Sequence, residues 1–337
     1  MKSRILNIKL PVLGRDSSMR YYWPKSASKN CLFPVRKCAQ IGFEFLTISD
    51  HFHPWISAQG ESPFVWNVLG ALSQVTEEIE IGTAVTCPTF RYHPAIVAQA
   101  AATSARMLEG RFRLGLGSGE ALNEKITAKA WPEASIRLAM LEEAVHIIRE
   151  LWKGKSTSHY GTYYQLENAT IFTLPEKLPE IIVAASGQKA ARLAGEIGDG
   201  FWGLAPDSEL LGTFQKSGGE SKPRYGQFHA CVASSESEAR KIVHERWPNG
   251  GLSGELNAIL PTPAHFEQTC QMVSEEMAVE NIVCSNDPGE HIEMIRKYAE
   301  AGYTHVSVHQ IGTEHSRFFD LYSQEVVPEF TRRKVGV

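Results

Sequence analysis

Ile181–Ile197 has the sequence IIVAASGQKAARLAGEI, which contains one complete strand–turn–helix unit. Ile181–Ala185 is a short, continuous apolar run that is typical of a strand buried on both faces. Small residues then form a turn, and Ala190–Ile197 has apolar residues at helical spacing. A strand that leads directly into a helix is the repeating unit of a parallel α/β sheet. The fold class therefore depends on how often this unit recurs.

The same alternation recurs along the whole chain. Short apolar runs bounded by turn residues predict further strands at Ile5–Leu10, Phe45–Ile48, Ile79–Thr86, Phe112–Leu116, Phe201–Leu204, Tyr225–Val232 and Val306–Gln310. Helical spacing predicts helices at Phe33–Ile41, Phe64–Val75, Pro94–Leu108, Ile136–Trp152, Ser235–Arg246, Ile292–Ala301 and Phe318–Phe330. This alternation predicts an α/β fold of the (β/α)8 TIM-barrel class, as a single domain over residues 1–337.

Three stretches do not fit the plain repeat. Ser156–Leu174 predicts a small hairpin after the fourth helix. The long insertion 247–280 is expected to cover the active-site mouth, because long loops after barrel strands lie at the C-terminal face. The short apolar run Asn281–Cys284 is either an additional strand or the true seventh strand.

Composition limits the possible functions. The chain has 337 residues, of which 43% are hydrophobic and 21% charged, and its net charge is −4. A weakly acidic chain argues against nucleic-acid binding, and without an apolar run of about 18 residues no membrane span is expected. The spacing of the six cysteines matches no zinc site, so we expect no metal and free thiols in a reducing cytoplasm.

The first candidate site is SDHFHPW, residues 49–55, directly after the predicted strand Phe45–Ile48. Side chains released at the C-terminal end of a barrel strand face the active-site mouth. His51 could move a proton there and Trp55 could line the cavity. Alternatively, His51 closes the strand end and Trp55 fills the core. A metal at His51 and His53 lacks a third ligand nearby.

Two glycine-containing turns are further candidates. GLGSGEALNE, residues 115–124, superficially resembles a dinucleotide-binding turn, but Glu120 or Leu122 occupies the third glycine position. Glu120 and Asn123 could instead project into the mouth, or the segment is a plain turn. AASGQK, residues 184–189, opens a helix whose free N–H groups could bind an anion, or it is a helix start capped by Ser186.

Five motifs then follow one another at barrel intervals: SDHFHPW (49–55), IGTAVTCPTFRYHPAIVAQAAAT (81–103), LGLGSGEALNE (114–124), AASGQKAARLAGEIGDGF (184–201) and AGYTHVSVHQIG (301–312). Together they resemble the coenzyme F420-dependent glucose-6-phosphate dehydrogenase family of the luciferase-like superfamily, over about residues 42–330. The resemblance implies a TIM barrel that forms a homodimer and binds F420, a deazaflavin.

The resemblance also implies roles for residues. His51 would handle the proton of the substrate hydroxyl, Trp55 would orient the substrate, and Glu120 would protonate the deazaflavin. Cofactor contacts would come from Asp50, Cys87, Asn123, Ser186, Gly187, Lys189 and Ala190, and from a non-proline cis peptide at Ala84–Val85. The substrate would contact Trp55, Leu204, Asp207 and Asn281.

The chain departs from the family where sugar phosphates bind. The family uses two lysines and one arginine, but Asp207 and Asn281 occupy two of these positions and no lysine lies between Lys241 and Lys297. A phosphate would therefore meet a carboxylate and no fixed cation. The first-loop glutamate of the family is also missing near Pro24. We expect an uncharged alcohol, sugar or ketone; HFHPW also resembles the family's secondary-alcohol dehydrogenases.

Three alternatives remain open: an F420-dependent glucose-6-phosphate dehydrogenase proper, an FMN-dependent monooxygenase of the luciferase type, and an inactive barrel that binds F420 as a carrier or sensor. DHFHPW and SGEALNE favour the deazaflavin branch over FMN. We expect a small-molecule substrate, a homodimer and a cytoplasmic protein.

Overall fold

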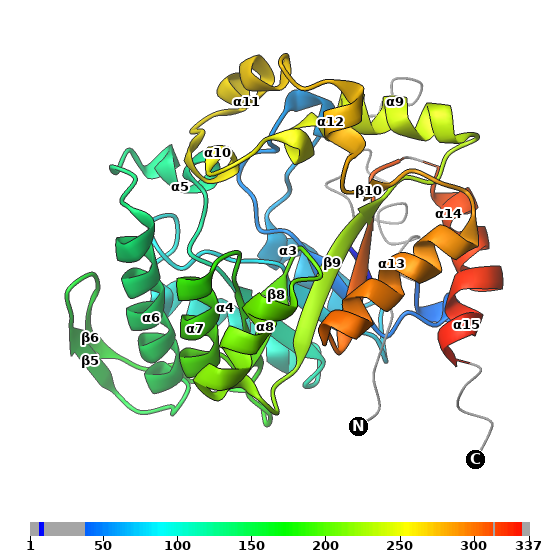
Figure 1. Cartoon of the computed structure of the whole chain (residues 1–337). Helices are drawn as coiled ribbons and strands as arrows, with labels where there is room; N and C mark the ends of the chain where they lie inside the picture. The colour runs from blue at the N-terminus through cyan, green and yellow to red at the C-terminus, as the bar shows by residue number, and fades with distance from the viewer. Residues whose placement is uncertain (1–6, 10–37, 313, 332–337) are drawn as a thin grey trace, which may run out of the picture.

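The computed structural model describes residues 7–9, 38–312 and 314–331 (Figure 1). A parallel sheet forms its centre. In chain order its strands are β1 (Asn7–Lys9), β2 (Phe45–Ile48), β3 (Glu80–Thr83), β4 (Phe112–Leu116), β7 (Glu180–Ala184), β8 (Gly200–Gly203), β9 (Arg224–Ala230), β10 (Ile282–Val283) and β11 (His305–Gln310). The predicted parallel α/β fold is confirmed, and each predicted strand is found within three residues of its expected bounds among the described residues.

Strand pairing joins the two ends of the sheet. The order is β10-β9-β11-β1-β2-β3-β4-β7-β8, and β8 pairs with β9 as well. Phe201 lies opposite Arg224 in that last pairing, and on the other side Asn7 lies between Ser307 and Phe45. Every one of these ladders is parallel. The arrangement is consistent with a TIM-type α/β fold.

β10 is an additional strand, the first of the two alternatives. It pairs with the end of β9, at Ile282 opposite His229 and Val283 opposite Ala230. β8 pairs with the beginning of β9, at positions 224–226. The same edge of β9 is therefore shared by two strands, and β10 takes the place of β8 toward the C-terminal end.

The helices are α3 (Val65–Ser73), α4 (Pro94–Met107), α5 (Ala121–Glu124), α6 (Ala134–Leu151), α7 (Gln188–Ile197), α8 (Ser208–Phe214), α9 (Glu236–Arg246), α10 (Leu256–Ile259), α11 (Pro263–Cys270), α12 (Glu275–Val279), α13 (Pro288–Ala301), α14 (His315–Leu321) and α15 (Val327–Thr331). Local sequence explains several bounds. Prolines occupy the first turn of α4 and α13, where their missing N–H costs nothing, and Gly302 ends α13 with φ 106°.

Two predictions about helices were incomplete. α8 follows β8 and was not predicted, because the helix has only seven residues. Such a short helix shows little periodicity. α9 was predicted, but it lies in the excursion that follows β9 rather than among the helices around the sheet. In Figure 1, α9 gathers with α10, α11 and α12 at the end of the molecule where β9 finishes. The excursion therefore begins before residue 247.

Apolar side chains form separate clusters inside and outside the ring of strands. The largest cluster packs the helices on the strands and contains, for example, Leu114, Phe228 and Tyr322. A second cluster joins α9, α11 and α12 to the loop after β2 through Trp55, Trp247 and Phe266. This second cluster attaches the excursion to the strand ends. The predicted hairpin is confirmed as β5 (Thr157–Tyr160) and β6 (Gln165–Ala169).

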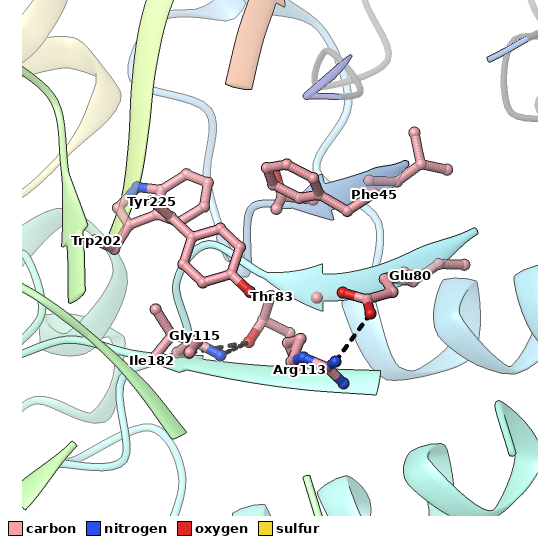
Figure 2. Close-up of a pocket in the computed structure, with 12 residues that line it drawn as sticks. Phe45, Glu80, Thr83, Arg113, Gly115, Ile182, Trp202 and Tyr225 are labelled. Atoms are coloured by element: carbon pink, nitrogen blue, oxygen red, sulfur yellow. Dashed lines mark hydrogen bonds and ion pairs between the residues drawn. The ribbon is translucent and has the colours of Figure 1, made fainter. Parts of the chain in front are cut away.

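The interior of the ring holds a pocket near the beginnings of the strands (Figure 2). Phe45, Trp202 and Tyr225 line one side of it. On the other side, Arg113 forms ion pairs with Glu80 at 2.9 Å and with Glu180 at 3.0 Å. These three charges join the first residues of β3, β4 and β7, at the opposite end of the strands from the candidate site.

Some predictions lie partly or wholly outside the described residues. They include Cys31, the position near Pro24 and most of the helix Phe33–Ile41, of which residues 38–41 are helical. The five described cysteines are free thiols, as expected. In the described part of the chain, no helix is long and apolar enough to cross a membrane.

Candidate active site

The loops after β2 and β4 bring the three predicted catalytic residues together. His51 follows β2, and its Nε2 lies 4.0 Å from Oε2 of Glu120, which follows β4. The Trp55 ring packs edge-on against the His51 ring, with 4.3 Å between centroids. Sequence spacing alone suggested that these side chains share a strand-end mouth, and the structure confirms their proximity.

Asn123 holds this arrangement in place. Its Oδ1 accepts hydrogen bonds from the backbone N–H groups of Phe52 at 2.8 Å and His53 at 3.3 Å. Its Nδ2 lies 3.5 Å from Glu120 Oε2. The side chain is 5% exposed, so its amide is used to fix the His51 loop against the β4 loop.

Asp50 belongs to a buried charge cluster beneath the site. Its carboxylate accepts a hydrogen bond from Thr86 Oγ1 at 2.8 Å and pairs with Arg91 at 3.0 Å. Glu124 lies on the other side of Arg91 and accepts the backbone N–H of Arg91 at 2.9 Å. Arg91 thus lies between two buried carboxylates and pairs with both. Burial raises the pKa of Glu124, against the effect of these bonds.

The Ala84–Val85 peptide bond is cis, as the resemblance implies. Glycines of the β4 loop make room for this segment. A Cβ on Gly117 would lie 2.7 Å from Val85 Cγ2, and one on Gly119 would collide with Cys87 Sγ. Cys87 is buried, with its Sγ 2.9 Å from Thr89 Oγ1. The β4 loop can therefore approach the Val85 segment only because these positions lack side chains.

The start of α7 is open. Gly187 is its N-cap, without a side-chain cap, so the alternative of a Ser186-capped helix is wrong. A Cβ on Gly187 would meet no heavy atom within 4 Å. Ser186 and Lys189 are exposed and Ala190 is half-buried. The free N–H groups of this ten-residue helix suit an anionic group.

Three further residues predicted to contact the substrate lie after β8 or just before β10. Leu204 follows β8 and is 59% exposed. Asp207 is the N-cap of α8, where its Oδ1 accepts the N–H of Leu210 at 2.9 Å. Asn281 is exposed just before β10. Asp207 therefore has a helix-capping role that its sequence, Asp-Ser-Glu-Leu, could have indicated.

Sequence reasoning missed Trp247, His229 and His309. The Trp247 ring lies 5.2 Å from the Trp55 ring, edge to face. It also lies 5.2 Å from His229 and 4.8 Å from His309. On β9 and β11, Phe228 and Val308 pack outward against the helices, and His229 and His309 are the next residues along each strand. This alternation is the signal that could have placed both histidines inside the ring.

Trp55 has an unused hydrogen-bond donor. Its indole Nε1 is buried and has no hydrogen-bond partner among the residues that the structure describes. Its backbone N–H, in contrast, donates to Gln59 Oε1 at 2.9 Å. A buried N–H without an acceptor costs about 1–3 kcal/mol, so the site suits a ligand oxygen at this position.

A family model described as luciferase-like monooxygenase matches residues 29–305. The chain belongs to this luciferase-like family. Among curated relatives, this luciferase-like chain is 34% identical over 305 residues to an F420-dependent glucose-6-phosphate dehydrogenase of Microbacterium testaceum, with 87% of the chain and 91% of the relative covered. It is 35% identical to the protein of the same name from Intrasporangium calvum, with 87% and 92% covered. The resemblance seen in the sequence is confirmed.

Solved structures of similar fold extend this picture. One is an F420-dependent secondary alcohol dehydrogenase in complex with an F420–acetone adduct, with a TM-score of 0.85, 26% identity and coverage of 97% and 99% of the two chains. Another is the F420-dependent tetrahydromethanopterin reductase of Methanopyrus kandleri, with a TM-score of 0.72, 18% identity and the same coverage. The second likeness concerns the fold alone.

His53 does not belong to a cluster of metal-ligating side chains among the described residues. Within residues 7–9, 38–312 and 314–331, no group of three or more His, Cys, Asp and Glu side chains could hold a metal ion. His53 Nδ1 instead contacts the carbonyl oxygen of Leu122 at 3.2 Å. The arrangement at the strand ends fits an organic cofactor that brings its own redox chemistry.

Proposed function

We propose that this luciferase-like chain is an F420-dependent oxidoreductase that acts on the CH–OH group of an uncharged alcohol or sugar, or in reverse on a ketone. The cofactor is coenzyme F420, as in its curated relatives. The observation that carries the proposal is the meeting of His51, Trp55 and Glu120 at one strand-end mouth. Bound F420 supplies or accepts the hydride at its C5 atom.

The protein side chains handle the proton and the oxygen. A carbinol loses hydride readily only as its oxygen loses a proton, and a neutral imidazole at His51 takes that proton. The free indole N–H of Trp55 donates to the same oxygen and orients it. Glu120, 4.0 Å from His51, holds a proton for the cofactor ring.

The residues around the site fit the cofactor. The open N-terminus of α7 at Gly187, with Ser186, Lys189 and Ala190, would hold an anionic group of F420. The ring system would rest against Ala84–Val85, near Cys87, Asp50 and Asn123.

The substrate is expected to be uncharged. The positions of the family's phosphate-binding cations carry Asp207 and Asn281, and Asp207 is engaged as the cap of α8. The aromatic rings of Trp55 and Trp247 provide a neutral wall instead. Leu204 would complete it on the side of β8. The similarity to an alcohol dehydrogenase with a bound acetone adduct supports this class.

The remaining expectations belong to the same proposal. The chain forms a single (β/α)8 barrel domain over residues 1–337, with residues 247–280 over the mouth, and acts as a cytoplasmic homodimer. A second candidate is glucose-6-phosphate dehydrogenase proper, which the names of the curated relatives favour.

Two measurements test the proposal. We expect fluorescence titration to show much tighter binding of F420 than of FMN; equal or tighter FMN binding would overturn the cofactor assignment. We then expect F420 reduction, followed by absorbance, with a panel of uncharged secondary alcohols and sugars, and poor turnover with glucose 6-phosphate. Each lost charge-assisted bond to the phosphate is worth about 1.5–3 kcal/mol. Efficient turnover of glucose 6-phosphate at sub-millimolar concentration would favour the second candidate.

A further inference from the structure

His229 and His309 form a close pair in the wall of the candidate site. They are register partners on the neighbouring strands β9 and β11. Their Nδ1 atoms lie 2.9 Å apart, within hydrogen-bond distance. A hydrogen bond between two nitrogens needs one donor and one acceptor, so one Nδ1 carries the hydrogen and the other does not. Two protonated Nδ1 atoms would repel each other at this distance.

Trp247 connects this pair to the predicted catalytic residues. Its ring contacts both histidines and also Trp55, and Trp55 packs on His51. Trp247 is 7% exposed and belongs to the apolar cluster that attaches the excursion to the strand ends. The position of the Trp247 ring therefore depends on the side chains that pack against it.

A hydrogen-bonded bridge ties the same two segments together. Gln59 Nε2 donates to Asn249 Oδ1 at 2.8 Å, and Gln59 Oε1 accepts the backbone N–H of Trp55 at 2.9 Å. Gln59 and Asn249 are both buried. This bridge fixes the backbone of the Trp247 segment, while the rings of Trp55, His229 and His309 pack against the indole itself.

We propose that His229 and His309 are a positioning pair that holds Trp247 against Trp55 and so sets how tightly substrate binds. The inference rests on the proposed function, because it takes the surface beside Trp55 as the substrate wall. The pair contacts Trp247, whereas His51 packs on Trp55, so the pair acts through Trp247. Disturbing the pair should therefore change KM much more than kcat, and leave F420 binding unchanged.

Three variants test the pair. His309→Leu removes the nitrogen, and His309→Asn keeps a polar group near the position of Nδ1. The matched control is His291→Leu, a buried histidine of α13 whose Nδ1 lies 3.0 Å from Tyr322 Oη. The activity-independent readout is the exciton signal of the Trp55–Trp247 pair in circular dichroism, identified by its loss in Trp247→Phe.

We expect His309→Leu to lose the exciton signal and raise KM at least about tenfold, which corresponds to about 1.4 kcal/mol of binding, with kcat changed less than about threefold. His309→Asn should keep most of the exciton signal and have a KM close to that of the wild-type protein. His291→Leu should lower the melting temperature and leave KM and the exciton signal unchanged. An unchanged KM and exciton signal in His309→Leu would overturn the proposal.

The failure of the proposed function has a different signature. If none of the alcohols or sugars supports F420 reduction by the wild-type protein, the proposed function fails. The exciton signal still decides whether the pair positions Trp247. If His309→Leu does not fold, long-range proton–nitrogen NMR of the 15N-histidine-labelled wild-type protein decides. One protonated and one unprotonated Nδ1 in the pair supports the proposal, and two nitrogens in the same state contradict it.

Discussion

At the scale of the residue, His51 is the side chain on which proton transfer depends. We expect His51→Ala to lower kcat by about 10²–10⁴-fold, the usual effect of removing a positioned base, with little change in the Kd of F420. His53→Ala is the matched control, because His53 contacts the carbonyl oxygen of Leu122 rather than Glu120. Steady-state kinetics and fluorescence titration measure both. Nearly intact turnover in His51→Ala would mean that His51 only closes the strand end.

Buried thiols make the free energy of unfolding depend on pH in the alkaline range. Burial raises the pKa of Cys231 to about 12 from its ordinary 9.0. Between these values the unfolded chain has lost a proton that the native protein keeps, so the free energy of unfolding falls as pH rises through this window. One such thiol contributes a slope of roughly 1.4 kcal/mol per pH unit. The effect is fully absent below about pH 8.

Cys231→Ala tests this prediction. Its free energy of unfolding should decline less steeply than that of the wild-type protein between about pH 9 and pH 11, although the lost volume lowers its stability at neutral pH. Cys284, with its pKa raised to about 11, keeps part of the slope in both proteins. Urea unfolding under reducing conditions measures it. Parallel pH profiles of the two proteins would contradict the prediction.

Sequence reasoning found those site residues that directly follow a predicted strand. His51 and Glu120 are of this kind, because strand ends of a parallel sheet meet at one edge. It missed His229 and His309, because both lie inside strands rather than directly after one, although Gln227 and Ser307, two residues before them, continue the same alternation. It also predicted Asp207 as a substrate contact but not its role as the cap of α8.

At the scale of the element, the β4 loop depends on its glycines. A methyl group on Gly117 would overlap Val85 Cγ2, so Gly117→Ala must displace the segment on which the cofactor is proposed to rest. We expect a loss of F420 affinity of at least about tenfold and a loss of about 1–3 kcal/mol in stability.

Gly212→Ala is the control for Gly117→Ala. Gly212 lies in α8, and a Cβ there would meet nothing within 4 Å. Alanine at this position should stabilise the protein by about 0.5–1 kcal/mol and leave F420 binding unchanged. Thermal unfolding and fluorescence titration compare the two. Unchanged F420 affinity in Gly117→Ala would remove the β4 loop from the proposed cofactor site.

Elements with strong periodicity were predictable and short ones were not. The sequence placed α6 and α4 to within two residues of their bounds, because many turns repeat the same apolar face. α8, α10 and α12 have only four to seven residues, too few for an apolar face to repeat over several turns. The position of α9 in the excursion could not be predicted either, since its pattern equals that of a helix packed on the sheet.

At the scale of the whole molecule, the two ends of the strands have different tasks. The ion pair of Arg113 with Glu80 (Figure 2) and its pair with Glu180 join the beginnings of the strands, whereas the candidate site follows their ends. Arg113→Met leaves two partly buried carboxylates without their cation. We expect it to cost about 1–3 kcal/mol of stability and to leave kcat and KM unchanged.

Arg149→Met is the comparison for this prediction. The pair of Arg149 and Asp199 is more exposed, so its loss should cost less than about 1 kcal/mol. Chemical unfolding and steady-state kinetics distinguish the two cases. A large fall in kcat of Arg113→Met, with the fold intact, would mean that the two ends are coupled.

The shared edge of β9 also has a consequence for how this protein could be changed. The excursion leaves at Cys231 and returns at Val283, and the N–H of Cys231 donates to the carbonyl of Val283 at 2.8 Å. Its two ends are therefore neighbours, and a replacement of another length would close onto the same two points at a cost that grows only slowly with length. The segment between them could be transplanted as one piece, so that a new substrate preference is installed while the ring of strands beneath it stays untouched.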